Sequence, residues 1–129
     1  MKPGDPRRKV LRGREAQRRG RLAESLCCWH LRFLGWRILA RRWRCPAGEI
    51  DILARRGGVL AIIEVKSRGE VAAAATALSR RQRRRIGRAA QAFLVSRPDL
   101  AALAPRFDVM LVGRLPLPRH LRGVWQADG

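Results

Sequence analysis

Residues 49–67 have the sequence EIDILARRGGVLAIIEVKS, in which two runs rich in aliphatic residues flank a glycine pair. Glycine reaches the positive φ angles that a tight two-residue turn needs, so Gly57-Gly58 between two such runs is a strong signal for a β-hairpin. The stretch therefore predicts two antiparallel strands, at residues 49–55 and 59–67, that are joined through these glycines.

The register of this hairpin brings charged side chains together. With the glycine pair at the centre of the turn, Asp51 lies directly opposite Glu64, and Glu49 lies directly opposite Lys66. Directly opposed side chains share one face of the sheet, with Cβ atoms about 5 Å apart. Two carboxylates at that distance repel each other unless a positive charge lies between them. A hard divalent cation, which binds carboxylate and carbonyl oxygens, would satisfy this arrangement.

Lys66 adds a third charged group to the same face, and Glu49 is a candidate supporting residue. Lys66 is one of three lysines in a chain with 26 arginines, which favours a compact ammonium at this position over a planar guanidinium. The alternative interpretation is an ordinary cross-strand salt bridge between Glu49 and Lys66, with Asp51 and Glu64 near solvent. A register slip of one residue would separate Asp51 from Glu64 and remove the cluster.

Two helices are predicted from apolar residues at helical spacing. The first spans residues 14–34 and ends at Gly35. Its apolar stripe consists of Leu22, Ala23, Leu26, Cys27, Leu31 and Leu34. Glu24 lies beside this stripe, so we expect it to project toward the interior edge of the domain. The second helix runs from Ser79, a suitable N-cap, to about Ser96. Its inner face consists of Ile86, Ala89, Ala90, Phe93 and Leu94.

The remaining elements complete an α/β fold in the order α-β-β-β-α-β. Further strands are predicted at residues 36–44 and 106–112, with a short last one at Val124-Trp125. This pattern favours a mixed central sheet of four to five strands flanked by helices. We expect residues 14–129 to form one domain, because a chain of 129 residues supports a single modest core. Residues 1–13 are predicted to be a flexible basic arm.

Charge is the dominant feature of the composition, with 29 basic residues against 10 acidic ones and a net charge of +19. Such an excess predicts a polyanionic partner, because arginine contacts to phosphates release condensed counterions. A codon bias toward arginine is the alternative explanation, but the arginines are clustered. The candidate phosphate contacts are Arg18, Arg19, Arg21, Arg81, Arg83 and Arg84.

Other compositional features indicate a cytoplasmic protein without a membrane association. No apolar run has the length that a bilayer requires, and the basic N-terminal residues lack the apolar stretch of a signal peptide. Three cysteines are an odd number and a poor basis for a disulfide framework. Cys27 is expected to be a core residue rather than a zinc ligand, and Asp108 is expected to pair with Arg106.

Three motifs resemble the signature of the bacterial YraN-like family, whose members are largely uncharacterised. These motifs are Gly48-Glu49-Ile50-Asp51, Ile63-Glu64-Val65-Lys66-Ser67-Arg68 and Arg106-Phe107-Asp108-Val109. The resemblance extends from about Gly20 to Val112. The family is similar to the restriction-endonuclease-like superfamily, with its D…(E)xK core, and most closely to archaeal Holliday-junction resolvases. The resemblance implies a three-layer fold with the sheet between helices.

The resemblance also implies a metal-dependent endonuclease that hydrolyses DNA, including branched or junction DNA. Asp51 and Glu64, with the Val65 carbonyl, would hold Mg²⁺ or Mn²⁺, and the metal would activate a water. Lys66 would orient this water or stabilise the transition state. Glu24 matches a glutamate that the resolvases add from the first helix, and it would reach the metal directly or through water.

The chain differs from the family pattern at two positions, and two alternative functions remain consistent with the sequence. The chain has Arg42 where family members usually carry Asn, and Gln82 where they tend to carry Lys. A non-catalytic nucleic-acid-binding module on a nuclease scaffold is the main alternative function, and a partner-binding adaptor is another. Resolvase-like enzymes act as dimers on two-fold symmetric substrates, so a homodimer is also left open.

Overall fold

The computed structural model describes residues 6–67, 79–113 and 117–126, with the side chains of residues 6–19 excepted. Its centre is a five-stranded mixed sheet in the order β1-β2-β3-β4-β5. The strands are β1 (Arg37–Cys45), β2 (Gly48–Arg56), β3 (Val59–Ser67), β4 (Ala104–Val112) and β5 (Arg119–Trp125). Neighbouring strands are antiparallel except for β3 and β4, which are parallel.

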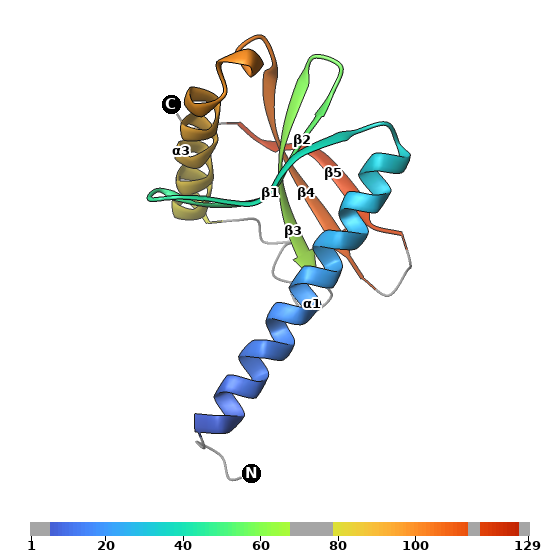
Figure 1. The fold of residues 1–129 in the computed structure, drawn as a ribbon, viewed down its shortest axis with the longest axis vertical. Coiled ribbons are helices and arrows are strands. Elements are labelled where there is room, and N and C mark those ends of the chain that lie inside the picture. Colours follow the sequence, from blue (N-terminus) through green and yellow to red (C-terminus); the bar gives the residue numbers. More distant parts are fainter. Residues whose placement is uncertain (1–5, 68–78, 114–116, 127–129) are drawn as a thin grey trace.

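Helices flank this sheet and complete three layers. They are α1 (Pro6–Phe33) and α3 (Arg80–Ser96), and a 3-10 turn, η2 (Pro98–Leu100), follows α3. Figure 1 shows α3 and α1 on different sides of the sheet. The order α-β-β-β-α-β-β confirms the predicted fold class, and β5 begins earlier than the predicted last strand because it pairs with β4 from Leu111↔Arg119 onward. Within the described residues, no helix is long and apolar enough to span a membrane.

The β2–β3 hairpin has the register that its glycines predict. Ile52 pairs with Ile63, the paired positions continue to Arg56 and Val59, and Gly57 has a φ of +58°. The ladder between the two strands ends at Ile52 and Ile63, whereas β3 continues alongside β4 as far as Ser67. Strands β2 and β3 therefore separate beyond this pair, and the next residue on each strand is acidic.

Two apolar cores lie on the two faces of the sheet. The core under α3 contains Ile50, Leu53, Leu60 and Ile62 from the hairpin, with Ile86, Ala89, Ala90 and Phe93 from the helix. The core under α1 contains Ile52, Ala54, Ala61 and Ile63, with Cys27, Cys28 and Leu31 from the helix. The predicted inner face of α3 is confirmed, with Leu94 partly buried at its edge.

The predicted apolar stripe of α1 is wrong in three positions. Ala23, Cys27 and Leu31 are buried, but Leu22 is 64% exposed, Leu26 is 37% exposed and Leu34 is 41% exposed. Leu22 and Leu26 each precede a buried residue by one position, which rotates them by about 100° away from the sheet. The sheet covers only a narrow line of this helix, so apolar character alone overestimates its buried face.

Helix α1 is longer than the sequence predicts. It begins at Pro6 rather than at Arg14, so it extends into the segment that was expected to be a basic arm. Proline suits the first turn of a helix, where its missing N–H is not needed. Figure 1 shows the N-terminal part of α1 projecting away from the sheet, while the C-terminal part packs on it. Residues 1–5 of the predicted arm lie outside the described part of the chain.

Candidate active site

A cavity of about 240 Å³ opens where β2 and β3 separate beside α1. It is lined by Gly20, Ala23, Glu24, Asp51, Glu64, Val65, Lys66 and Ser67. Four consecutive residues of β3 contribute to this lining, so the cavity lies at the end of the strand rather than over one face. The structure thus brings together Glu24, Asp51, Glu64 and Lys66, the four residues that were predicted to carry catalysis.

Asp51 bridges the gap that opens between the two strands. Its Oδ2 accepts a hydrogen bond of 2.8 Å from the backbone N–H of Val65. The alternation of buried faces is interrupted here, because Ile50 and Leu53 both pack under α3 while Ile52 packs under α1. Burial raises the pKa of Asp51 to about 6, although the Val65 hydrogen bond acts in the opposite direction, and the nearby charge of Glu24 adds to the rise.

Glu64 is the second carboxylate, and one of its oxygens has no partner among the described groups. Its Oε1 is buried and makes no hydrogen bond. Burial raises the pKa of Glu64 well above its usual range, and the negative charge of Asp51 raises it further, while the charge of Lys66 lowers it. Two adjacent buried carboxylates cannot both ionise without a compensating cation. The pair therefore holds either a shared proton or a positive charge.

Lys66 supplies an ammonium to this end of β3. It lines the cavity, and its charge lowers the pKa of both Asp51 and Glu64. Strand β3 carries Glu64 and Lys66 two residues apart, a spacing that places both on one side of an extended strand. The Lys66 side chain thus lines the same cavity as the two carboxylates.

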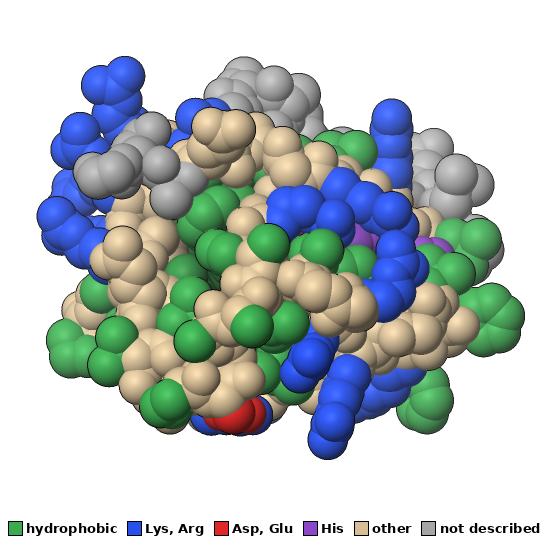
Figure 2. Space-filling view, turned by 90° about the horizontal axis from the view of Figure 1, so that it is seen from above, with side chains coloured by type: hydrophobic (Ala, Val, Ile, Leu, Met, Phe, Trp, Pro, Cys, Tyr) green, Lys and Arg blue, Asp and Glu red, His purple; other side chains and the backbone are tan. Residues whose placement is uncertain are grey.

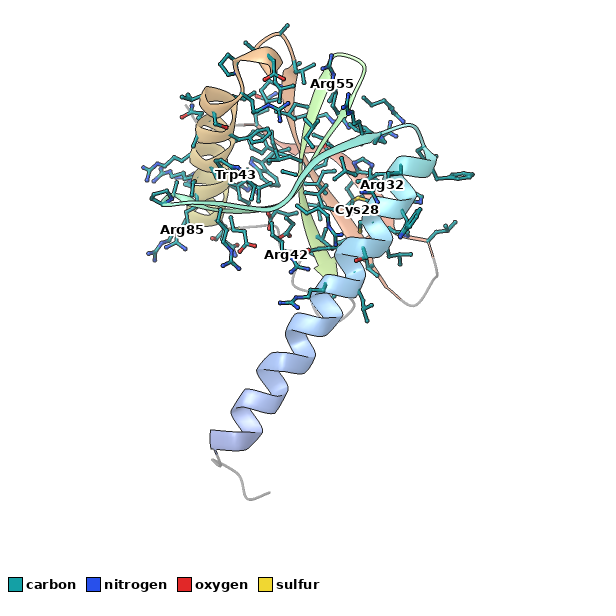
Figure 3. The ribbon with its side chains drawn as sticks, in the orientation of Figure 1. Cys28, Arg32, Arg42, Trp43, Arg55 and Arg85 are labelled. Carbon is teal, nitrogen blue, oxygen red and sulfur yellow. The ribbon has the colours of Figure 1, made fainter. Side chains whose placement is uncertain are left out.

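Glu24 reaches the cavity from α1, as the sequence predicts, and it is 9% exposed. Its Oε2 lies 2.6 Å from the Nε of Arg42 in a partly buried ion pair. Figure 3 shows Arg42 beside α1 near the end of β3. Sequence reasoning noted Arg42 only as a departure from the family pattern and did not include it in the site.

Arg42 has an unusual backbone conformation, of a kind that asparagine adopts more readily than most residues. Its φ is +48°, and it is the one non-glycine residue with a positive φ in the described part of the chain. This left-handed region costs most L-residues roughly 1–2 kcal/mol, and asparagine is among the residues that tolerate it best. Arg42 keeps this conformation while its guanidinium is paired with Glu24.

The donor set of the cavity fits a hard divalent cation in part. Asp51 and Glu64 provide carboxylate oxygens, including the buried Glu64 Oε1 that lacks a partner, and such oxygens are the ligands of Mg²⁺. Across the described ranges, no set of three or more His, Cys, Asp or Glu side chains is arranged to hold a metal. The third carboxylate of the cavity, that of Glu24, is paired with Arg42 instead.

Glu49 lies outside the cavity lining. It is exposed, it pairs with Arg44 across β1 and β2, and its Oε2 lies 3.4 Å from the Nε of Arg44. The direct opposition to Lys66 is not formed, since the β2–β3 ladder ends at Ile52. Glu49 still contributes a negative charge that raises the pKa of Asp51.

The arginines predicted to contact phosphates differ in their surroundings. Arg21, Arg81 and Arg84 are exposed. Arg83 is partly buried, and its guanidinium carbon lies 6.0 Å from the centre of the Trp125 ring. The side chains of Arg18 and Arg19 lie outside the described residues. Arg83 is therefore tied to the fold more closely than its neighbours on α3.

Gln82 has a structural role at the start of α3. Its backbone N–H donates to the Ser79 hydroxyl, and its side-chain oxygen accepts from the Ser79 N–H at 3.1 Å. This reciprocal capping box satisfies two N–H groups that the helix leaves without partners. The second departure from the family pattern is thus used for helix capping.

Sequence comparisons place the chain among bacterial relatives of similar length. Residues 23–112 match the model of a family described as uncharacterised protein family UPF0102. The chain is 47% identical over 117 residues to a UPF0102 protein of Paramagnetospirillum magneticum, covering 88% of this chain and 91% of the relative. It is 50% identical over 114 residues to a UPF0102 protein of Parvibaculum lavamentivorans, covering 88% and 86%.

A third relative extends the similarity to nearly the whole chain. A UPF0102 protein of Azorhizobium caulinodans is 46% identical over 127 residues, which cover 98% of this chain and 95% of the relative. The acidic residues of the cavity and Lys66 lie within the span that the family model matches. The chain therefore belongs to the uncharacterised protein family UPF0102.

Proposed function

We propose that this chain is a metal-dependent phosphodiesterase that cleaves DNA as an endonuclease. The observation that carries the proposal is the buried carboxylate pair of Asp51 and Glu64 in an open cavity, with Lys66 beside it. The unpartnered Glu64 Oε1 supports a cation at this position, because a buried polar oxygen without a hydrogen bond is costly. Substrate phosphates would approach through the mouth of the cavity.

Each residue has a distinct task in the proposed reaction. Asp51, Glu64 and the Val65 carbonyl would hold Mg²⁺ or Mn²⁺, which when bound supplies Lewis-acid chemistry at the phosphate and lowers the pKa of water. Lys66 would donate hydrogen bonds to the attacking water or to a phosphate oxygen on which negative charge grows. The Val65 N–H fixes the Asp51 carboxylate, so that it needs little reorganisation to bind.

DNA would be held by the basic surface without sequence readout. Arg21 on α1 and Arg81 and Arg84 on α3 are exposed arginines of a chain with a net charge of +19. Contacts of such side chains to phosphate oxygens position a duplex but carry no sequence information. Branched substrates, which expose phosphates in several directions, are a suitable class for this distribution.

One observation favours a second function, a nucleic-acid-binding module without cleavage. The Glu24 carboxylate is already neutralised by Arg42 at 2.6 Å. Only two carboxylates of the cavity are therefore left for a cation, which would weaken the metal site. The function would then be nucleic-acid binding by the basic surface. This function predicts binding that depends on salt but not on Asp51.

Cleavage of labelled branched, duplex and single-stranded DNA with Mg²⁺ or Mn²⁺ distinguishes the two functions. We expect the wild type to cleave at least one of these substrates, and both Asp51→Ala and Lys66→Ala to lose at least about 100-fold in rate. Arg44→Ala, at an exposed arginine outside the cavity, is the control for the charge change. Tight binding by all proteins without any product would support the binding module instead.

Association into a homodimer also stays a prediction. Leu22, Leu26, Trp29 and Phe33 are exposed on α1 at intervals of three and four residues, a spacing that places them along one side of a helix. Sedimentation velocity of the full chain, with and without branched DNA, measures whether the chain is a monomer or a dimer.

A further inference from the structure

We propose that Arg42 competes with a divalent cation for Glu24. While Arg42 is paired with Glu24, the cation would bind only to Asp51 and Glu64. Glu24 would become its third carboxylate ligand when Arg42 releases it. The inference rests on the proposed function in one respect, namely that Asp51 and Glu64 hold the cation. It adds a regulatory contact that limits how tightly the cation is held.

The contact between Arg42 and Glu24 is close and partly buried. The Nε–Oε2 distance is 2.6 Å, and the two side chains are 32% and 12% exposed. Charge-assisted hydrogen bonds of this kind are stronger than neutral ones, and partial burial reduces the extent to which water weakens the attraction between the two charges. A cation that takes Glu24 must therefore displace the guanidinium, and this displacement subtracts from its affinity.

The strand register places Arg42 across from Asp51 on the neighbouring strand. Arg41 pairs with Ile52 and Trp43 pairs with Ile50, so Arg42 is at the position across from Asp51. Its φ of +48° departs from the extended backbone of the rest of β1. Figure 3 shows Arg42 on the side of α1, whereas its neighbour Trp43 points toward α3.

The negative charge of Glu24 lies close enough to the other carboxylates of the cavity to affect cation binding. Glu24 is near enough to Asp51 for its negative charge to raise the pKa of that group, and both residues line the same cavity. A third carboxylate in this position would add a ligand and a negative charge to a site of hard oxygen donors. Arg42 removes both contributions while the ion pair persists.

Mn²⁺ titration of the full chain, followed by the loss of free Mn²⁺ in electron paramagnetic resonance, tests the inference. We expect Arg42→Asn to bind Mn²⁺ about tenfold more tightly than the wild type. Asparagine tolerates the left-handed backbone at this position, so the variant should fold, and Arg42→Gly serves as a second variant without a side chain. Arg41→Asn removes the same charge from the adjacent residue, whose guanidinium contacts Ser25, and is the matched control.

Glu24→Gln completes a double-mutant cycle. In the wild-type background we expect it to change Mn²⁺ affinity little, because Arg42 already occupies Glu24. In the Arg42→Asn background we expect it to abolish the tenfold gain. A gain that persists without Glu24, or one that Arg41→Asn reproduces, would show a general charge effect and overturn the inference.

The outcomes also separate this inference from the proposed function. Asp51-dependent Mn²⁺ binding that is equal in the wild type and in both Arg42 variants would overturn the inference and leave the proposed function intact. Absence of Mn²⁺ binding in the wild type and in the Arg42 variants would overturn both. Binding that appears only after Arg42 is replaced would support the inference and show that the wild-type site is held closed to the metal.

Discussion

Burial of the ionised Asp51 side chain destabilises the folded protein when no metal is bound. Its carboxylate is buried near Glu64 and Glu24, and burial is the main reason why its pKa rises from 3.8 to about 6. Such a group favours its protonated form when the chain is folded, so that the folded state binds more protons than the unfolded state between these two values. Folding stability that depends on this group therefore falls as the pH rises through this range.

Asp51→Asn should stabilise the metal-free protein at neutral pH. Asparagine can still accept the hydrogen bond from the Val65 N–H, but it carries no charge to bury. In EDTA we expect a gain in unfolding free energy of about 1–3 kcal/mol at pH 7.5 and little or no gain near pH 4. Urea unfolding at both pH values measures this difference. An equal effect at the two pH values would contradict the assignment of the cost to ionised Asp51.

Strands β4 and β5 are joined by a buried charge network that does not take part in the proposed site. Asp108 is fully buried and accepts two hydrogen bonds of 2.9 Å from Arg106, as the sequence predicts. It also contacts His120 Nε2 at 2.7 Å and accepts from the Gly123 N–H at 2.9 Å. Burial alone would raise the pKa of Asp108, but these hydrogen bonds outweigh it and lower the pKa below 3.8.

Asp108→Asn should destabilise the chain by roughly 3–5 kcal/mol, because it leaves the charge of Arg106 without its buried partner. The exposed pair Arg97–Asp99 has the same spacing and two similar hydrogen bonds, so Asp99→Asn is the matched control and should change stability little. Since the pKa of Asp108 is lowered, its stabilising contribution is present above pH 3.8 and is lost as the pH falls through the lower value. Equal melting temperatures of the two variants would contradict this role.

The elements differ in how far the sequence determines them. The hairpin register follows from Gly57-Gly58, and the start of α3 follows from Ser79, because both signals act over a few residues. The buried face of α1 could not be predicted well, since it depends on how narrow a line of the helix the sheet covers. The sequence predicted that Asp51 and Glu64 would be neighbours but not that β2 and β3 would separate at them.

The contact between Glu24 and Arg42 is the main feature of the site that sequence reasoning missed. It joins residues 18 positions apart on different elements, and it depends on a left-handed residue within a strand, which strand periodicity does not predict. The one available signal was the departure from asparagine, a residue suited to that backbone conformation.

At the scale of the whole molecule, basic residues far outnumber acidic ones, with 29 of the former and 10 of the latter. Figure 2 shows Lys and Arg side chains in several separate groups on the visible face, with a small acidic patch at its lower edge. The net charge of +19 predicts that DNA binding weakens steeply with salt, since each phosphate contact releases counterions. In the proposed function the basic residues would contribute affinity for DNA, while the cavity would provide the chemistry.

Individual arginines should differ in their share of this salt dependence. Arg81→Ala and Arg84→Ala should each lower the slope of log K against log salt by about one, if the side chain contacts a phosphate. Arg83→Ala should leave the slope nearly unchanged and instead lower the melting temperature, because Arg83 packs against Trp125. Fluorescence anisotropy of labelled DNA at several salt concentrations measures the slopes. A larger change for Arg83→Ala than for its two neighbours would contradict this division.

In the proposed function, Asp51 and Glu64 share a divalent cation. The most direct measurement is an anomalous-difference map of a crystal of the full chain soaked in Mn²⁺. We predict a peak in the cavity at direct coordination distance, about 2.1 Å, from an oxygen of each carboxylate, and no such peak in Asp51→Ala. An ordered cavity with no peak at saturating Mn²⁺, or a peak that persists without Asp51, would contradict the claim.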